Sequence, residues 1–188
     1  MSATAHPEAI IAVRTLIALI FLSAAVGKMR NWQIFRGVVA NYRLLPPVLV
    51  GPVTYVLPPA EAAIGAALPT GLLTPWLPAA AAGLLGVFAV AMGINLLRGR
   101  RYIDCGCFQG TLKQPLSWIL VTRNGLLASL LLAAGAAPSG QPGGWTAANG
   151  LLAGVALFIV LQSLNTLWAI VPAVRRPKRP GIQMEGAS

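Results

Sequence analysis

Two cysteines one residue apart carry the most reactive chemistry in this sequence. They stand in the run Asp104-Cys105-Gly106-Cys107-Phe108 and are the only cysteines of the 188-residue chain. Thiols at this spacing can close a small strained disulfide, and the central glycine eases the tight turn that such a ring needs. A strained, accessible disulfide is more oxidising and more labile than a structural one, which points to thiol–disulfide exchange. Two free thiols in a membrane loop are the alternative interpretation.

The charged neighbours of the cysteines bear on the state of the thiols. Asp104 disfavours the thiolate of Cys105, whereas Arg101 and Lys113 favour it. A metal site is the weaker interpretation, because two thiolates need further Cys or His ligands and the single histidine, His6, lies at the far N-terminus. We therefore expect no metal here.

The composition of the chain is typical of a membrane protein. Hydrophobic residues make up 56% and charged residues 10% of the chain, and the mean hydropathy is +0.73. Such a chain has too little polar surface to coat a soluble globule. The net charge of +10 could suggest nucleic acid, but nearly all basic residues lie between or after apolar runs. The sequence has no aromatic-interleaved basic patch, so nucleic-acid binding is not expected.

Five apolar runs approach or exceed the roughly 20 helical residues that cross a hydrocarbon core. Because every backbone polar group must be satisfied in lipid, each run is expected to be a helix. The predicted fold is an all-α polytopic membrane helix bundle that has the lipid bilayer as its partner. The expected spans are residues 9–28, 48–70, 76–97, 115–137 and 146–171.

The first run has a second interpretation as a signal peptide. Arg14 precedes an apolar stretch, and Ser23-Ala24-Ala25 resembles a cleavage site. However, the segment before Arg14 is already apolar and contains Glu8, and basic residues follow the run directly. We therefore favour a retained helix.

Residues 31–45 are predicted to form a short amphipathic helix. Apolar residues recur there at helical spacing, namely Phe35, Val38, Val39 and Tyr42. Such a helix can lie in the headgroup region with Trp32 and Tyr42 as interfacial anchors. An ordinary connector whose apolar residues pack against the bundle is the alternative.

The second run is broken by prolines and contains Glu61, the one acid well inside an apolar segment. An intramembrane carboxylate is costly and usually faces the bundle interior with a partner, for which Lys28 and Arg123 are the candidates. Glu61 either handles protons and organises a site, or it forms a structural ion pair that locks helices together.

Small and polar residues in the later runs suggest how the helices pack. The run 76–97 is rich in alanine and glycine and is predicted to be a central packing helix. Asn95 can hydrogen-bond across the bundle, as can Gln162 and Asn165 from the fifth run. Arg123 either snorkels to the headgroups or pairs with the acid of the second run.

Positive charge falls on alternate connectors. Residues 28–43, residues 98–113 and the tail 172–188 each carry four basic residues, whereas 71–75 and 138–145 carry none. The positive-inside rule then places the N-terminus outside, and the C-terminus and the cysteine loop 98–113 on the cytoplasmic side. The basic tail is predicted to be disordered and held near anionic lipid.

Six short motifs occur in order along residues 9–136: Gly27-Lys28, Asn41-Tyr42-Arg43-Leu44-Leu45-Pro46, Pro58-Pro59-Ala60-Glu61, Asn95-Leu96-Leu97-Arg98-Gly99, Asp104-Cys105-Gly106-Cys107-Phe108 and Arg123-Asn124. Together they resemble the MauE family of methylamine utilisation proteins, which are DoxX-like, redox-associated multi-pass membrane proteins. The family pattern has glycine directly after Cys-Gly-Cys-Phe, whereas Gln109 precedes Gly110 here.

The resemblance implies a DoxX-like four-helix core over residues 9–137, after a short tail 1–8, with 146–171 as an additional fifth transmembrane helix. It also implies a place in a bacterial-type inner membrane and a role in the maturation of methylamine dehydrogenase. The small subunit of that enzyme is exported and dense in disulfides, and a thioredoxin-like partner of the MauD type is thought to act alongside. Family members also occur outside methylamine metabolism.

The favoured hypothesis is a membrane thiol–disulfide relay in which Cys105 and Cys107 are the redox pair, supported by Asp104, Glu61 and Arg123. One dithiol pair must pass its electrons to a partner protein or a membrane quinone, although no sequence feature demands a quinone and no cofactor is evident. The alternative is a non-catalytic assembly or export scaffold. A small-solute transporter, suggested by the proline-broken second run, ranks last because the sequence shows no internal repeat.

Overall fold

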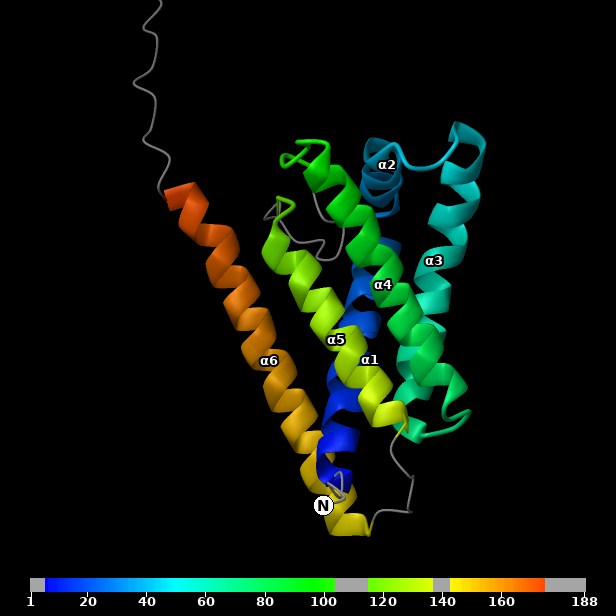
Figure 1. Cartoon of the computed structure of the whole chain (residues 1–188), viewed down its shortest axis with the longest axis vertical. Helices are drawn as coiled ribbons and strands as arrows, with labels where there is room; N and C mark the ends of the chain where they lie inside the picture. The colour runs from blue at the N-terminus through cyan, green and yellow to red at the C-terminus, as the bar shows by residue number, and fades with distance from the viewer. Residues whose placement is uncertain (1–5, 104–114, 137–142, 175–188) are drawn as a thin grey trace, which may run out of the picture.

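Long α-helices run side by side through the whole molecule (Figure 1). The structure is a computed structural model that describes residues 6–103, 115–136 and 143–174, with side chains up to residue 167. The described elements are α1 Pro7–Arg30, α2 Trp32–Tyr42, α3 Pro47–Ala67, the 3₁₀-helix η1 Leu68–Thr70, α4 Trp76–Leu97, α5 Trp118–Ala136 and α6 Gly144–Val174.

Five segments are long and apolar enough to cross a membrane: α1, α3 with η1, α4, α5 and α6. The predicted all-α polytopic membrane bundle is therefore confirmed, and the five spans agree with the expected ranges within a few residues. Proline in the first turn of α1 and of α3 marks where these helices begin, because its fixed φ suits that position and its missing N–H is not needed there. The last helix extends to Val174, beyond the expected end at 171.

The central helix of the bundle is α1. It contacts α2, α3, α5 and α6 and is buried over a larger share of its span than any other segment. The prediction that α4 is the central packing helix is therefore wrong. A Cβ added at Gly83, Gly86 or Gly93 of α4 would meet no atom within 4 Å. These glycines therefore do not face a neighbouring helix. Small residues permit close helix packing, but their presence does not say which face of the helix packs.

The main hydrophobic core gathers around the middle of α1. These side chains are buried in contact with one another, and their close packing gains dispersion energy that a void would lose. The buried members come from α1, η1, α4 and α5: Leu16, Ile17, Ala18, Phe21, Leu68, Ala81, Ala82, Leu85, Leu127 and Leu131.

The two ends of the bundle differ in how closely the helices approach. Around the start of α1, a Cβ added to Gly150 or Gly154 of α6 would lie 2.7 Å from Ile11 Cβ or 2.6 Å from Thr15 Cβ. At the same end, Gly65 of α3 meets α1 and Gly135 of α5 meets Pro78 of α4 in the same manner. We call this end, with its four close-approach glycines, the closed end.

The opposite end holds α2, the last turn of α4 and the last turn of α6 (Figure 1). We call it the open end. The basic connectors 28–43 and 98–101 both lie there, whereas the uncharged connector 71–75 lies at the closed end. The segregation of charge to one face agrees with the pattern read from the sequence. The basic tail beyond Val174 lies outside the described residues.

The predicted short helix between the first two spans is present as α2. Phe35 and Val38 are buried, and the ring of Trp32 packs on Tyr55 of α3 with centroids 3.8 Å apart. The contacts of α2 therefore agree with the alternative interpretation, in which its apolar residues pack against the bundle. Its place in the headgroup region stays a prediction.

Candidate functional site

The cysteine pair lies in a segment whose two ends meet. Asp104, Cys105 and Cys107 are outside the described residues. The described ends on either side are joined by a backbone hydrogen bond, in which the N–H of Leu116 donates to the carbonyl oxygen of Ile103 at 3.1 Å. We call Ile103 and Leu116 the loop base.

The loop base packs on a second hydrophobic cluster at the open end. Leu116 is buried there with Met92, Leu96 and Leu120, and partly buried neighbours complete the cluster: Tyr42, Phe88, Ile103 and Val121. These contacts hold the start and the end of the cysteine segment against α4, α5 and the end of α2.

A buried ion pair joins α1 to α3. The ammonium of Lys28, in the last turn of α1, pairs with Glu61 Oε1 in the middle of α3. The side chains are 4% and 0% exposed. Of the two candidate partners for Glu61, Lys28 is the one that pairs with it among the described residues. A charge in such surroundings needs its partner, because the desolvation cost of an unpaired ion is several kcal/mol.

The backbone of α3 is irregular just before Glu61. Pro58 and Pro59 have no N–H, so the carbonyls of Thr54 and Tyr55 receive no helical hydrogen bond four residues on. The Thr54 hydroxyl donates to the carbonyl of Val50, one turn earlier in the helix. The second oxygen of Glu61, Oε2, is buried and accepts no hydrogen bond from the described residues. One carboxylate oxygen of Glu61 thus pairs with Lys28, and the other can accept a hydrogen bond from a further donor.

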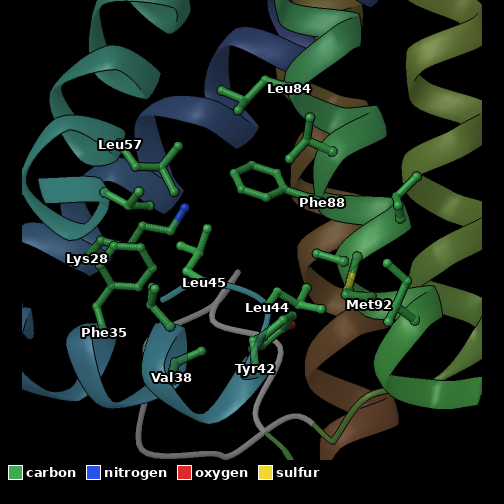
Figure 2. A pocket seen from close by; sticks show the side chains of 16 residues that line it. Lys28, Phe35, Val38, Tyr42, Leu44, Leu45, Leu57, Leu84, Phe88 and Met92 are labelled. Carbon is green, nitrogen blue, oxygen red and sulfur yellow. The ribbon is translucent and has the colours of Figure 1, made fainter. Parts of the chain in front are cut away.

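A chamber of about 650 Å³ opens beside Lys28 at the open end (Figure 2). Its 16 lining residues come from the end of α1, α2, the connection that follows α2, α3 and α4. Lys28 and Tyr42 supply its polar side-chain atoms, and every other lining side chain is apolar. Figure 2 shows the amino group of Lys28 pointing between Leu57 and Phe88. Chambers of roughly 300–1,000 Å³ with few polar groups are typical of small-molecule sites.

Two aromatic rings hold the Lys28 ammonium in place. Lys28 Nζ lies 5.2 Å from the centroid of Phe35 and 4.9 Å from that of Phe88. Both distances suit cation–π attraction. Phe88, Tyr42 and Met92 belong both to the chamber and to the cluster that holds the loop base. The ion pair, the chamber and the ends of the cysteine segment therefore adjoin one another.

A groove continues from the chamber between α3 and α4. It has a volume of about 580 Å³ and an entirely apolar lining. Chamber and groove share Val53 and Leu57 of α3 with Leu84 and Val87 of α4. Val87 is 62% exposed on the outer face of the bundle, so the groove meets the lipid side.

Arg123 is placed differently from its predicted role beside Glu61. Its Nη1 donates to Asn165 Oδ1 of α6 at 3.2 Å, and so links α5 to α6. The interhelical hydrogen bond expected of Asn165 is therefore confirmed, whereas Gln162 bonds to Asn165 within α6. The amide nitrogen of Asn95 also bonds within its own helix, to the carbonyl of Ala91 at 3.0 Å. The prediction that Asn95 reaches across the bundle is wrong for this nitrogen, because the i−4 carbonyl is the nearest acceptor in a helix.

Sequence reasoning missed two features. In the sequence Arg14 appears only as a charge beside an apolar stretch, but in the structure it is buried and its Nη2 lies 3.4 Å from Thr74 Oγ1. The chamber was missed as well, although its signal was present in the helical spacing of Phe35, Val38 and Tyr42. That spacing was assigned to the membrane interface. Among the described residues, no group of three or more His, Cys, Asp or Glu could hold a metal ion.

The chain is similar in sequence to a known protein family over most of its length. The family model for methylamine utilisation protein MauE matches residues 7–137. The chain is 44% identical over 170 residues to the methylamine utilization protein MauE of Paracoccus denitrificans, covering 89% of this chain and 91% of the relative. It is 42% identical over 174 residues to that of Paracoccus versutus, covering 92% of each. No solved structure matches the chain.

Similarity of this extent includes α1 to α5, and with them Lys28, Glu61, the chamber and the cysteine pair. In the two Paracoccus relatives it covers about nine-tenths of both chains. The chain belongs to the MauE family of methylamine utilisation proteins.

Proposed function

We propose that this protein is a membrane thiol–disulfide relay, with Cys105 and Cys107 as its redox pair, that supports the maturation of an exported enzyme such as methylamine dehydrogenase. The observation that carries the proposal is the contact of the loop base with the chamber beside the Lys28–Glu61 pair. A redox pair with a single dithiol must exchange electrons with two partners, and this contact brings both ends of the cysteine segment to a membrane-facing site.

The proposed exchange conserves atoms and electrons. A thiolate of a thioredoxin-like partner attacks one sulfur of the Cys105–Cys107 disulfide and forms a mixed disulfide. The second thiolate of the partner breaks that bond, so the partner leaves oxidised and the pair becomes a dithiol. The oxidised partner can then give its disulfide to the client on the membrane face that the cysteine loop occupies, before the client is exported. Asp104, Glu61 and Arg123 support the pair by charge and position and do not exchange electrons.

The proposed location is a bacterial-type inner membrane, with the N-terminus outside and the C-terminus and cysteine loop on the cytoplasmic side. The segregation of basic connectors to the open end supports this orientation. Labelling Cys105 and Cys107 with a membrane-impermeant maleimide, in intact and permeabilised cells, tests it. Labelling only after permeabilisation and reduction is expected. Labelling in intact cells would overturn the orientation and place the pair where it meets exported partners directly.

The relay is tested by replacing each cysteine in a strain that lacks its own copy of the protein. Cys105→Ser and Cys107→Ser should each reduce the active, disulfide-bonded client to the level of the deletion strain, because exchange needs both sulfurs. Ser129→Ala, on the exposed face of α5, is the matched control and should leave the client unchanged. Full maturation with either cysteine variant would contradict the relay.

A non-catalytic scaffold for assembly or export is the second candidate. The exposed apolar face of α6 favours it, with Leu152, Ile159 and Val160 all more than half exposed. A scaffold would tolerate the loss of at least one thiol, so the same cysteine variants separate the two functions.

A further inference from the structure

We propose that the chamber and the groove together form a binding site for a lipophilic quinone, with the ring in the chamber and the isoprenoid tail in the groove. This inference rests on the proposed function in one respect: the quinone would accept the electrons of the Cys105–Cys107 dithiol. The binding site itself consists only of residues of α1 to α4 and the connection after α2.

The polar chemistry of the chamber matches the head of a quinone. The Lys28 ammonium has three N–H groups, and Glu61 Oε1 accepts one of them. The ammonium also faces Phe35 and Phe88, which fix its position. A quinone ring offers carbonyl oxygens that accept hydrogen bonds, and its flat apolar body suits a chamber walled by these two rings. The contact that orients the ring is therefore a hydrogen bond from Lys28 to a quinone carbonyl.

The groove matches the tail. Its lining is wholly apolar, and it begins where the chamber ends, at the four shared residues Val53, Leu57, Leu84 and Val87. Val56, on its rim, is 65% exposed. A long hydrocarbon chain gains free energy from apolar surroundings along its whole length, and the groove lets it run from the chamber to the lipid.

A phospholipid fits the same space less well. Its charged headgroup requires many polar partners when it leaves water. The lining offers one ammonium, already paired with Glu61, and one phenol, that of Tyr42. An acyl chain alone would fill the groove but would make no use of Lys28.

The redox step balances with a quinone as acceptor. The two thiols lose two electrons and two protons and form the disulfide, while the quinone gains both and becomes the quinol. Because the site opens to the bilayer, it can serve the cysteine pair whichever membrane face the loop occupies.

The test uses purified full-length protein in detergent, carrying Cys105→Ser and Cys107→Ser so that no electron transfer occurs. The probes are decylubiquinone and decylbenzene, which carries the same tail without carbonyls. Decylubiquinone is expected to raise the unfolding temperature in a saturable manner and decylbenzene to have little effect. Equal shifts with both probes would make the site a lipid-tail groove and overturn the proposal.

Paired variants locate the bound quinone. Ala91→Trp fills the chamber from α4 and should weaken decylubiquinone binding by at least about tenfold, whereas Ala133→Trp on the exposed face of α5 should not. An unchanged affinity in Ala91→Trp would contradict the chamber as the site. Should that variant not fold, photocrosslinking of the parent protein with an azido-quinone decides. Crosslinks are expected in 28–57 and 84–94, and crosslinks confined elsewhere would overturn the assignment.

The outcome for the quinone site is separable from the outcome for the relay. Quinone binding with fully matured client in the single-cysteine variants would refute the relay and keep the site. Loss of maturation in those variants without quinone binding would keep the relay and assign its electrons to another acceptor.

Discussion

The closed and open ends of this bundle are built on opposite principles. At the closed end, four glycines let helix backbones approach so closely that an added methyl group would overlap a neighbour. At the open end, the helices leave a chamber of about 650 Å³ and are joined by polar side chains. Backbone contact therefore stabilises one half of the molecule, while a small number of polar links permit a cavity in the other.

The most damaging change should be the removal of one ion at the open end. Lys28→Met leaves the Glu61 carboxylate buried without its partner and should lower the free energy of unfolding by about 3–5 kcal/mol. Lys28→Met with Glu61→Leu removes both charges and should recover most of that loss. Unfolding in mixed micelles measures both variants. A double variant as unstable as the single one would show that the pair supplies packing rather than charge balance.

A smaller effect is expected at two glycines, one at the closed end and one in the middle of α4, and the two effects should have opposite signs. Gly154→Ala brings a methyl group within 2.6 Å of Thr15 Cβ and should cost about 1–3 kcal/mol. Gly86→Ala in α4 meets nothing within 4 Å and should stabilise the helix by about 0.5–1 kcal/mol. The same unfolding measurement applies to both. Equal effects at the two positions would remove the distinction between close-approach and lipid-facing glycines.

The smallest effect should come from the link between α5 and α6 at the open end. A double-mutant cycle of Arg123→Met and Asn165→Leu isolates their hydrogen bond from the other contacts of each side chain. The coupling should be about 0.6 kcal/mol, the average for interhelical hydrogen bonds in membranes. Zero coupling would mean that this hydrogen bond does not help to hold α6, which then depends on its apolar contacts with the bundle.

Much of the fold could be predicted from hydropathy, because the spans and α2 depend on local composition. A cationic partner for Glu61 could also be predicted, since an acid within an apolar run needs one, and Lys28 and Arg123 were the candidates. The choice between Lys28 and Arg123 could not, because it depends on which face each helix turns toward α3. For the same reason the glycines of α4 suggested a central helix, when the close-approach glycines are in α3, α5 and α6.

The chamber could not be predicted from the sequence. It exists because α3 and α4 diverge toward the open end, and a crossing angle depends on the sum of many side-chain contacts. The spacing of Phe35, Val38 and Tyr42 was visible in the sequence, but an apolar face suits a lipid interface and a cavity wall equally. The cysteine pair, the clearest chemical signal in the sequence, lies outside the described residues, and its role stays a prediction.

The contact of α6 with the first turns of α1 has a consequence for how the protein is made. The start of α1 is completed by α6, which is synthesised after α2 to α5, since Gly150 and Gly154 fit against Ile11 and Thr15. Until α6 emerges from the ribosome, that face of α1 is covered only by lipid or by the insertion machinery. Lys28 is without its partner for a shorter time, because Glu61 is synthesised only 33 residues later. The Lys28–Glu61 pair can therefore form in the nascent chain before α6 reaches the start of α1.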